Sequence, residues 1–246
     1  MMLIQNKFDS YLLLKRIFDL ILAIILFILH LPIFFIIYIF VVFETKQFPF
    51  FVQERAIALN GNSFKIIKFR TLRKADHSSN EIEIKKHVLN NSHLEPYVGR
   101  VGKFLRLTGL DELPQLINII NDDMSFVGPR PLSISDLEMI AKNHPTFSQE
   151  RSKLNIKPGL SGLWQTNKDK ALSVKHLVEM DKFYYDERSL LFDAYLMIKT
   201  LNVILFGRHK DAIITGSKTK LIEHHSLAFF EICYLITVFI LLAIFY

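Results

Sequence analysis

The sequence predicts a mainly α-helical α+β protein that is associated with a membrane. Three observations lead to this class. An apolar run covers residues 20–43, a second covers residues 226–246, and the segment between them alternates β-prone and helix-periodic stretches. Half of the 246 residues are hydrophobic and the mean hydropathy is +0.26, which is high for a soluble globular protein. This length allows one domain of ordinary size with a few membrane elements, but not two full domains.

The first apolar run is long enough to cross a bilayer, which needs about 20 apolar residues. Lys15, Arg16 and Asp19 precede the run, and Pro32 falls in its middle. Because proline cannot donate the helical hydrogen bond, the helix should kink or break there. Two geometries follow, a kinked full span or a proline-broken helix that enters and leaves by the same face. Basic residues on both flanks, including Lys46, favour the second geometry.

A small β-hairpin is predicted between residues 50 and 72. The β-prone runs Phe50–Val52 and Phe64–Phe69 lie on either side of Asn60-Gly61, a turn dipeptide typical of hairpins. The polar residues 73–97 predict a solvated loop or a helical excursion. Apolar residues at helical spacing then predict helices over residues 111–121, 174–185 and 190–206.

The second apolar run predicts a transmembrane helix with its N-terminus in the cytoplasm, since basic residues precede it and none follows. The charge balance of 30 Lys and Arg against 24 Asp and Glu, a net +6, suits nucleic acid, an anionic bilayer or phosphate-rich substrates. The apolar runs favour the last two, so no nucleic-acid partner is expected. One cysteine excludes a disulfide framework, and nine scattered histidines argue against a zinc site.

The chemistry is predicted at the acidic pair Asp111–Glu112. Pro114 fits only the first turn of a helix, which places the pair at a helix N-terminus, where carboxylates and phosphates are both favoured. Acidic residues in this position are often plain caps, but Arg106 and Arg130 nearby in the sequence would balance phosphate charge. Neighbours on a helix point in different directions. The two carboxylates therefore need separate tasks, such as nucleophile, magnesium ligand or base.

Further basic residues indicate phosphate or headgroup contacts. Arg130 lies between two prolines that fix the backbone around it. Lys68 and Arg70 belong to a basic stretch on the second hairpin strand, which is either a solvated strand or a surface facing lipid headgroups or a nucleotide diphosphate. Lys15 and Asp19 stand in the poorer order for a helix ion pair, so anchoring at the membrane interface is favoured.

Together these segments resemble the monotopic phosphoglycosyl transferases, which are bacterial polyprenyl-phosphate sugar-1-phosphate transferases. The resemblance covers about residues 12–205 and is carried by Lys15–Asp19, Lys68–Thr71, Leu105–Gln115, Asp123–Pro131, Lys157–Leu163 and Asp181–Tyr185, followed by Ser189, Asp193 and Thr200. The acidic-pair segment and the Gly-Pro-Arg-Pro segment together make it specific. The sequence departs from the family pattern in several places. Leu31 stands where the family usually has Ser or Thr, Ala58 where glycine is expected, and Gly109 where Ser is usual. The loop at residues 53–55 is one residue longer than usual, and the run at 226–246 is not part of the minimal family core.

The resemblance implies a re-entrant N-terminal helix and an active site at the cytoplasmic face of the bacterial inner membrane. It also implies transfer of a sugar-1-phosphate from a UDP-sugar to undecaprenyl (polyprenyl) phosphate, with release of UMP and a covalent intermediate on Asp111. The implied site residues are Asp111 and Glu112 for catalysis, Asp111 as the Mg²⁺ ligand, Arg106 and Arg130 for phosphate, Lys68, Arg70 and Lys157 for substrate or headgroups, and Lys15, Arg16, Asp19 and Pro32 for membrane anchoring.

The predicted organisation has four parts: the re-entrant helix at 1–46, a cytoplasmic catalytic domain at 47–206, a polar linker at 207–225 and a transmembrane helix at 226–246. The reaction would initiate assembly of a capsule, exopolysaccharide, O-antigen or glycoprotein glycan. A non-catalytic scaffold that binds nucleotide sugars is the alternative, but it does not explain the acidic pair with both arginines. Another alternative transfers the sugar alone and releases UDP. The sugar and the oligomeric state, including a homo-oligomer, stay open.

Overall fold

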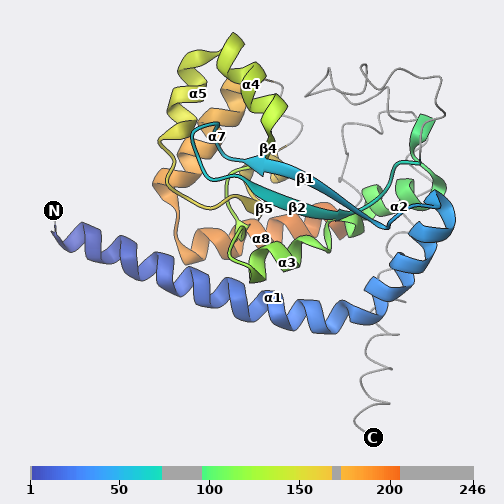
Figure 1. Ribbon diagram of the computed structural model, residues 1–246. Coiled ribbons are helices and arrows are strands. Elements are labelled where there is room, and N and C mark those ends of the chain that lie inside the picture. The colour runs from blue at the N-terminus through green and yellow to red at the C-terminus, as the bar shows by residue number, and fades with distance from the viewer. Residues whose placement is uncertain (1, 74–95, 168–172, 206–246) are drawn as a thin grey trace, which may run out of the picture. The chain divides into compact units, whose positions relative to one another are not determined.

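The computed structural model describes residues 2–73, 96–167 and 173–205 and is mainly helical with two small sheets (Figure 1). Its helices are α1 (Met2–Thr45), α2 (Arg100–Thr108), the short 3₁₀ helix η2 (Leu110–Glu112), α3 (Gln115–Ile120), α4 (Ile134–Asn143), α5 (Pro145–Ser152), α6 (Leu163–Thr166), α7 (Val174–Glu187) and α8 (Leu190–Leu205). Its strands are β1 (Phe50–Ala56), β2 (Phe64–Phe69), β3 (Ser125–Val127), β4 (Leu132–Ser133) and β5 (Gly159–Ser161). The predicted linker at 207–225 and transmembrane helix at 226–246 lie outside the described residues, as does most of the loop predicted at 73–97.

The chain forms two compact units. The described part of the first unit contains residues 2–26, 52–67, 115–167 and 173–201, and that of the second contains residues 27–51, 68–73, 96–114 and 202–205. The helix α1 and both hairpin strands pass from one unit into the other.

The N-terminal helix α1 is continuous. Pro32 lies inside it, and no non-helical residue separates the two halves, so the expected break at the proline is wrong. The ring of proline fixes φ near −65°, which is a helical value, and the proline therefore removes one hydrogen bond without forcing the chain out of the helix. From Ser10 to Thr45 the helix is long and apolar enough to cross a membrane by length and composition.

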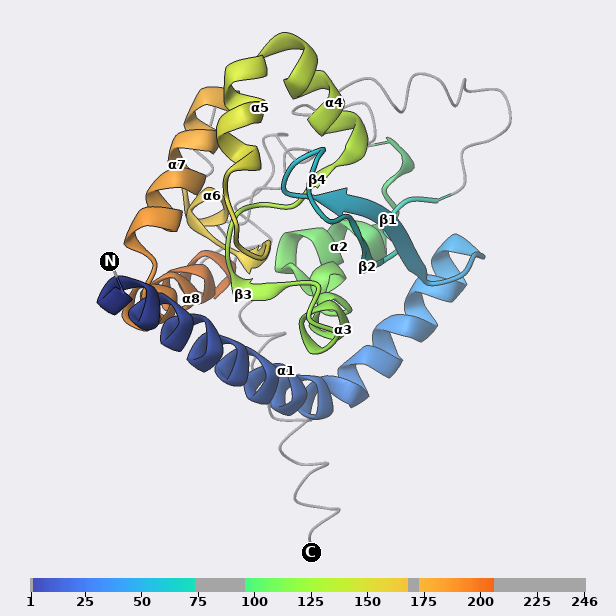
Figure 2. The same ribbon diagram turned by 60° about the vertical axis from the view of Figure 1, so that its left-hand side comes forward.

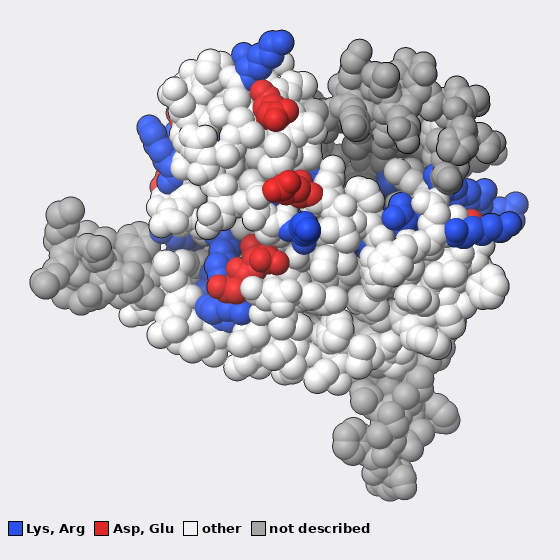
Figure 3. Space-filling view, viewed as in Figure 1, with Lys and Arg blue, Asp and Glu red and all other residues white. Residues whose placement is uncertain are grey.

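The apolar surface of α1 is largely exposed. In its most apolar 18-residue window, where the mean hydropathy is 3.1, only 17% of the residues are buried, whereas the core helix of a soluble protein would be mostly buried. In the space-filling view the lower edge, where Figure 1 places α1, is almost entirely free of charged side chains (Figure 3). The helix α8 also exposes apolar side chains at helical spacing, namely Leu191, Tyr195, Ile198 and Leu201. These faces suit the interior or interface of a lipid bilayer.

Helices build most of the first unit. In both ribbon views α4, α5 and α7 lie side by side (Figures 1 and 2). Their buried residues Leu137, Ile140, Leu177 and Val178 share one core cluster, which also contains Leu132 of β4. A capping box formed by Ser133 and Asp136 begins α4. The strands β3 and β5 pair in parallel, an arrangement that local patterning does not signal.

The predicted hairpin is confirmed as β1 and β2, with Gly61 in the turn between them. The short strand β4 pairs antiparallel with β1 and extends the sheet to the order β2-β1-β4. Helices α7 and α8 confirm the predictions at 174–185 and 190–206, whereas α2, α4 and α5 were not predicted. The helix expected over residues 111–121 is shorter, because α3 begins only at Gln115.

The second unit has an aromatic and aliphatic core. Phe69 of β2 lies 4.9 Å from Phe34 of α1 and 5.4 Å from Phe50, measured between ring centroids. Leu105 and Leu110 join the same cluster. Since Leu110 directly precedes Asp111, the core holds the start of the turn that carries the acidic pair.

Candidate active site

The acidic pair lies in η2, a single 3₁₀ turn between α2 and α3. Gly109 ends α2 with φ of 73°, a left-handed conformation that favours glycine. Asp111 is buried, with 8% of its surface exposed, and Glu112 is half-buried. The pair therefore does not occupy the first turn of a longer helix, and a helix dipole is not what favours phosphate here.

The second unit pairs two predicted site residues directly. The Lys68 Nζ donates to the Glu112 Oε1 at 2.6 Å, and the two side chains are 24% and 29% exposed. This ion pair gives the Glu112 carboxylate a basic partner from β2. Both side chains keep enough exposure to reach a ligand.

Arg106 is held by a hydrogen bond to Thr71, the second residue after β2. Its Nε donates to the Thr71 Oγ1 at 2.7 Å, and the arginine is 9% exposed. Thr71 is fixed in turn because Gly102 packs directly against its backbone, where any Cβ would overlap the Thr71 carbonyl. Arg106 is thus fixed in place before any ligand arrives, which lowers the entropy cost of binding phosphate.

Two other polar side chains of this unit hold backbone. The Arg70 Nε donates to the carbonyl of Phe48 at 2.8 Å, so this arginine supports the segment before β1. The Glu44 carboxylate accepts the backbone N–H groups of Val101 and Gly102 at 3.1 and 3.0 Å. A residue at the end of α1 therefore caps the first turn of α2.

The donor chemistry around the pair is compatible with magnesium. Among the residues that the structure describes, no group of three or more His, Cys, Asp or Glu could hold a metal alone. Magnesium, however, is commonly bound by one or two carboxylates together with substrate phosphates. Asp111 and Glu112 supply carboxylates of that kind, so the residues present fit an ion that arrives with a diphosphate.

In the first unit, Arg130 follows a tightly packed loop. The Gly128 N–H donates to the Ser161 carbonyl at 3.0 Å, and the Gly159 N–H donates to the Pro129 carbonyl at 2.9 Å. The Arg130 guanidinium lies 5.7 Å from the ring centroid of Trp164, a cation–π distance. The rigid presentation expected for this arginine thus comes from paired backbone as well as from its two prolines.

Lys157 and Arg16 share one carboxylate in the first unit. Both form ion pairs with Asp122, the second at 2.6 Å, and the Arg16 Nη1 also donates to the Ile119 carbonyl at 2.6 Å. Two cations on one carboxylate leave a net positive charge at this surface. It borders a pocket of about 790 Å³ whose lining includes Arg16, Asp19, Asp122 and Lys157 but not the acidic pair.

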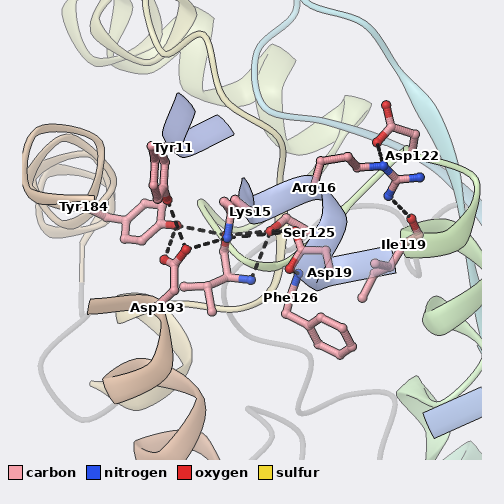
Figure 4. A network of polar contacts seen from close by, with 11 residues as sticks. Tyr11, Lys15, Arg16, Asp19, Ile119, Asp122, Ser125, Phe126, Tyr184 and Asp193 are labelled. Carbon is pink, nitrogen blue, oxygen red and sulfur yellow. Dashed lines mark hydrogen bonds and ion pairs between the residues drawn. The ribbon is translucent and has the colours of Figure 1, made fainter. Parts of the chain in front are cut away.

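Lys15 and Asp19 are buried in a polar network (Figure 4). The Lys15 Nζ lies 2.7 Å from the Asp193 Oδ2 and 4.0 Å from the Asp19 Oδ2. Asp19 accepts the Ser125 hydroxyl at 2.7 Å. The partners of Lys15 and Asp19 are therefore groups of the protein itself. The predicted role in anchoring at the membrane interface would have placed these side chains at lipid headgroups.

Asp193 and Tyr184 belong to the same network, although no role was predicted for either of them. The Tyr184 hydroxyl lies 2.7 Å from the Asp193 Oδ1, and the Tyr11 hydroxyl donates to the Oδ2 at 3.0 Å. Burial and the nearby carboxylate raise the pKa of Tyr184 above its ordinary value, so its hydroxyl stays protonated and can donate. A signal for Asp193 existed, because a carboxylate inside the apolar segment Leu190–Leu205 requires a partner.

An exposed apolar helix joined to half-buried acidic and basic groups defines a membrane-associated protein whose site suits phosphate-bearing ligands. More narrowly, the chain belongs to the bacterial sugar transferase family, whose model matches residues 10–207.

Three relatives illustrate the family. The chain is 34% identical over 205 residues to a UDP-galactose-lipid carrier transferase of Erwinia amylovora, covering 78% of this chain and 40% of the relative. It is 30% identical over 205 residues to an undecaprenyl-phosphate galactose phosphotransferase of Salmonella typhimurium, covering 78% and 40%. It is 34% identical over 202 residues to the exopolysaccharide production protein ExoY of Sinorhizobium fredii, covering 79% and 86%. The chain thus spans only about two fifths of several curated relatives that it matches.

Proposed function

We propose that this chain transfers a sugar-1-phosphate from a UDP-sugar to a polyprenyl phosphate such as undecaprenyl phosphate, and so initiates glycan assembly. The observation that carries the proposal is the acidic turn itself. Asp111 is buried beside Glu112, Glu112 is paired with Lys68, and Arg106 is fixed by Thr71. Relatives named for UDP-galactose and undecaprenyl phosphate support this choice of donor and acceptor.

The proposed reaction has two displacements at one phosphorus atom. In the first, an Asp111 carboxylate oxygen attacks the sugar-proximal phosphorus of the UDP-sugar. The bond to the bridging oxygen breaks, and UMP leaves with that oxygen and its electron pair. In the second, a phosphate oxygen of the lipid attacks the same phosphorus, which frees the Asp111 carboxylate and yields the lipid diphosphate sugar. Splitting the transfer in this way is ordinary nucleophilic catalysis.

The surrounding residues have supporting tasks. Arg106 and Arg130 would bind phosphoryl oxygens and offset the charge that develops on them. Lys68 would hold Glu112 in place, and Glu112 would assist at the acceptor phosphate. When bound, magnesium would neutralise charge on the diphosphate, with Asp111 as its protein ligand.

The charges that flank the apolar part of α1 favour re-entrance. Lys15 and Arg16 precede it, and Lys46 follows it. Basic residues are in excess on the cytoplasmic side of membrane segments. Both ends of α1 would therefore lie at the cytoplasmic face, where UDP-sugars are found.

A labelled donor tests the reaction. The purified chain, in lipid nanodiscs with magnesium and undecaprenyl phosphate, receives UDP-sugars labelled in the sugar-proximal phosphate. We expect release of UMP, labelled lipid diphosphate and, without lipid, label retained on the protein. Asp111→Asn should abolish all three, whereas the exposed control Asp186→Asn should retain them. Release of UDP would refute the proposed bond cleavage, and no turnover with any UDP-sugar would favour a scaffold.

Cysteine labelling tests the topology. Cys233 is first replaced by Ser, and a single cysteine is then placed at Ser10 or at Lys46, near the two ends of the apolar part of α1. Both cysteines should react with a membrane-impermeant maleimide only from the cytoplasmic side. Reaction of either from the periplasmic side would show a full span. A third cysteine at Lys218 or beyond Tyr246 would test whether the run at 226–246 crosses the membrane.

A further inference from the structure

A fully buried ion pair lies outside the groups that the proposed reaction uses. Arg151 of α5 and Asp181 of α7 are 1% and 3% exposed, and the Arg151 Nε donates to the Asp181 Oδ2 at 3.0 Å. Burial raises the pKa of Asp181 to about 6, while Arg151 and the backbone N–H of Arg130 favour its charged form. Two charges taken out of water at such a cost need an explanation.

The pair holds the backbone of Arg130 from both sides. The Arg151 Nη2 donates to the carbonyl of Arg130, and the Asp181 carboxylate accepts the N–H of Arg130. The two residues of the pair lie 21 and 51 positions further along the chain, so this contact joins three distant segments. Both polar backbone groups of one residue are thereby fixed, and the direction in which its side chain leaves the loop is fixed with them.

A purely stabilising bridge between α5 and α7 explains the pair less well. The same helices already share an exposed ion pair, Lys182 with Glu150 at 3.3 Å, which does not carry the cost of burial. The Arg151 Nη1 is buried and has no hydrogen-bond partner among the described residues, which costs stability. A bridge selected for stability alone would not retain such a group.

We propose that Arg151 and Asp181 are positioning residues that aim the Arg130 guanidinium at a phosphoryl group of the nucleotide sugar. The inference rests on the proposed function for the identity of that group. Neither residue needs to touch the ligand. Their effect on catalysis passes through Arg130, which they present next to the Trp164 ring.

Tryptophan fluorescence provides a readout that does not depend on turnover. Trp164 is the only tryptophan in the chain, and the Arg130 guanidinium lies over its ring. Arg130→Ala should change the emission of Trp164, and Asp181→Asn and Arg151→Lys should change it in the same direction. Lys182→Gln, which breaks the exposed bridge between the same helices, is the matched control and should leave the emission unchanged. Emission unchanged in Asp181→Asn and Arg151→Lys would overturn the proposal.

A double-mutant cycle separates positioning from general stability. Asp181→Asn should lower kcat/KM for the UDP-sugar about tenfold in the wild-type background but less than about twofold in an Arg130→Ala background, because residues that act through one another are not additive. Arg151→Lys keeps the charge but cannot reach both partners, so its loss of kcat/KM should exceed its loss of thermal stability. Equal losses in both backgrounds would refute positioning. An inactive wild-type enzyme with the fluorescence pattern intact would refute only the proposed function.

Discussion

Replacing Asp193 by Asn should destabilise the protein strongly, because Asp193 balances the buried charge of Lys15. The two charged atoms lie 2.7 Å apart, and both side chains are less than 8% exposed. The amide of Asn keeps the shape and can still accept one hydroxyl, but it removes the negative charge. The buried ammonium of Lys15 is then left with Asp19, whose nearest oxygen is 4.0 Å away.

The size of the effect follows from this geometry. Breaking a buried ion pair by removing one partner costs about 3–5 kcal/mol. Because Asp19 still offers a weaker partner, we expect the lower end, about 3 kcal/mol. For a chain of 150–250 residues each kcal/mol shifts the melting temperature by about 2–4 °C, so the expected decrease is about 6–12 °C.

Thermal unfolding of the purified protein in nanodiscs measures the shift. Glu179→Gln is the matched control, since Glu179 forms an exposed ion pair with Lys175 at 3.8 Å and its loss should change stability by less than about 0.5 kcal/mol. The double variant Lys15→Met with Asp193→Asn removes both charges, keeps an amide oxygen that accepts a tyrosine hydroxyl, and should recover part of the loss. A decrease below 2 °C for Asp193→Asn, or a double variant less stable than the single one, would refute the assignment of Asp193 as the counter-charge.

Two further predictions concern the turn that carries the acidic pair. Thr71→Val removes the acceptor of the 2.7 Å hydrogen bond from Arg106 and should lower kcat/KM for the UDP-sugar about tenfold, while Thr71→Ser should restore it; equal activity of the Val and Ser variants would contradict a role for the hydroxyl. Gly109→Ala places a Cβ at φ of 73° and should lower the free energy of unfolding by about 1–2 kcal/mol, measured by thermal melting. No change with Ala would mean that the turn adopts another conformation.

The sequence predicted those features whose signals are local. The hairpin follows from β-prone runs around Asn60-Gly61, and α7 and α8 follow from helical periodicity. The acidic pair and Arg106 were found because they stand close together in the sequence. The break expected at Pro32 was wrong, because proline removes one helical hydrogen bond but its fixed φ is compatible with a helix.

The contacts that hold the candidate site could not be predicted in the same way. Asp193 meets Lys15 across 178 residues, and Arg106 meets Thr71 across 35. No local pattern states which distant polar group will satisfy a buried charge. The sequence signals only that a charge in an apolar element needs a partner, as for Asp193 in α8.

Other long-range contacts share a different form, in which a polar side chain binds the backbone of a distant segment. Asn118 binds the Ile67 N–H at 3.0 Å and the Lys65 carbonyl at 2.7 Å, and Glu44 binds the start of α2. A bond to backbone depends on the side chain that binds and not on the side chain of the residue that is held. Substituting Ile67 should therefore leave its segment in place, whereas Asn118→Leu should displace β2 without removing any group that touches the substrate. A loss of activity in Asn118→Leu would therefore result from the displacement of β2 and not from the removal of a group that reacts with the substrate.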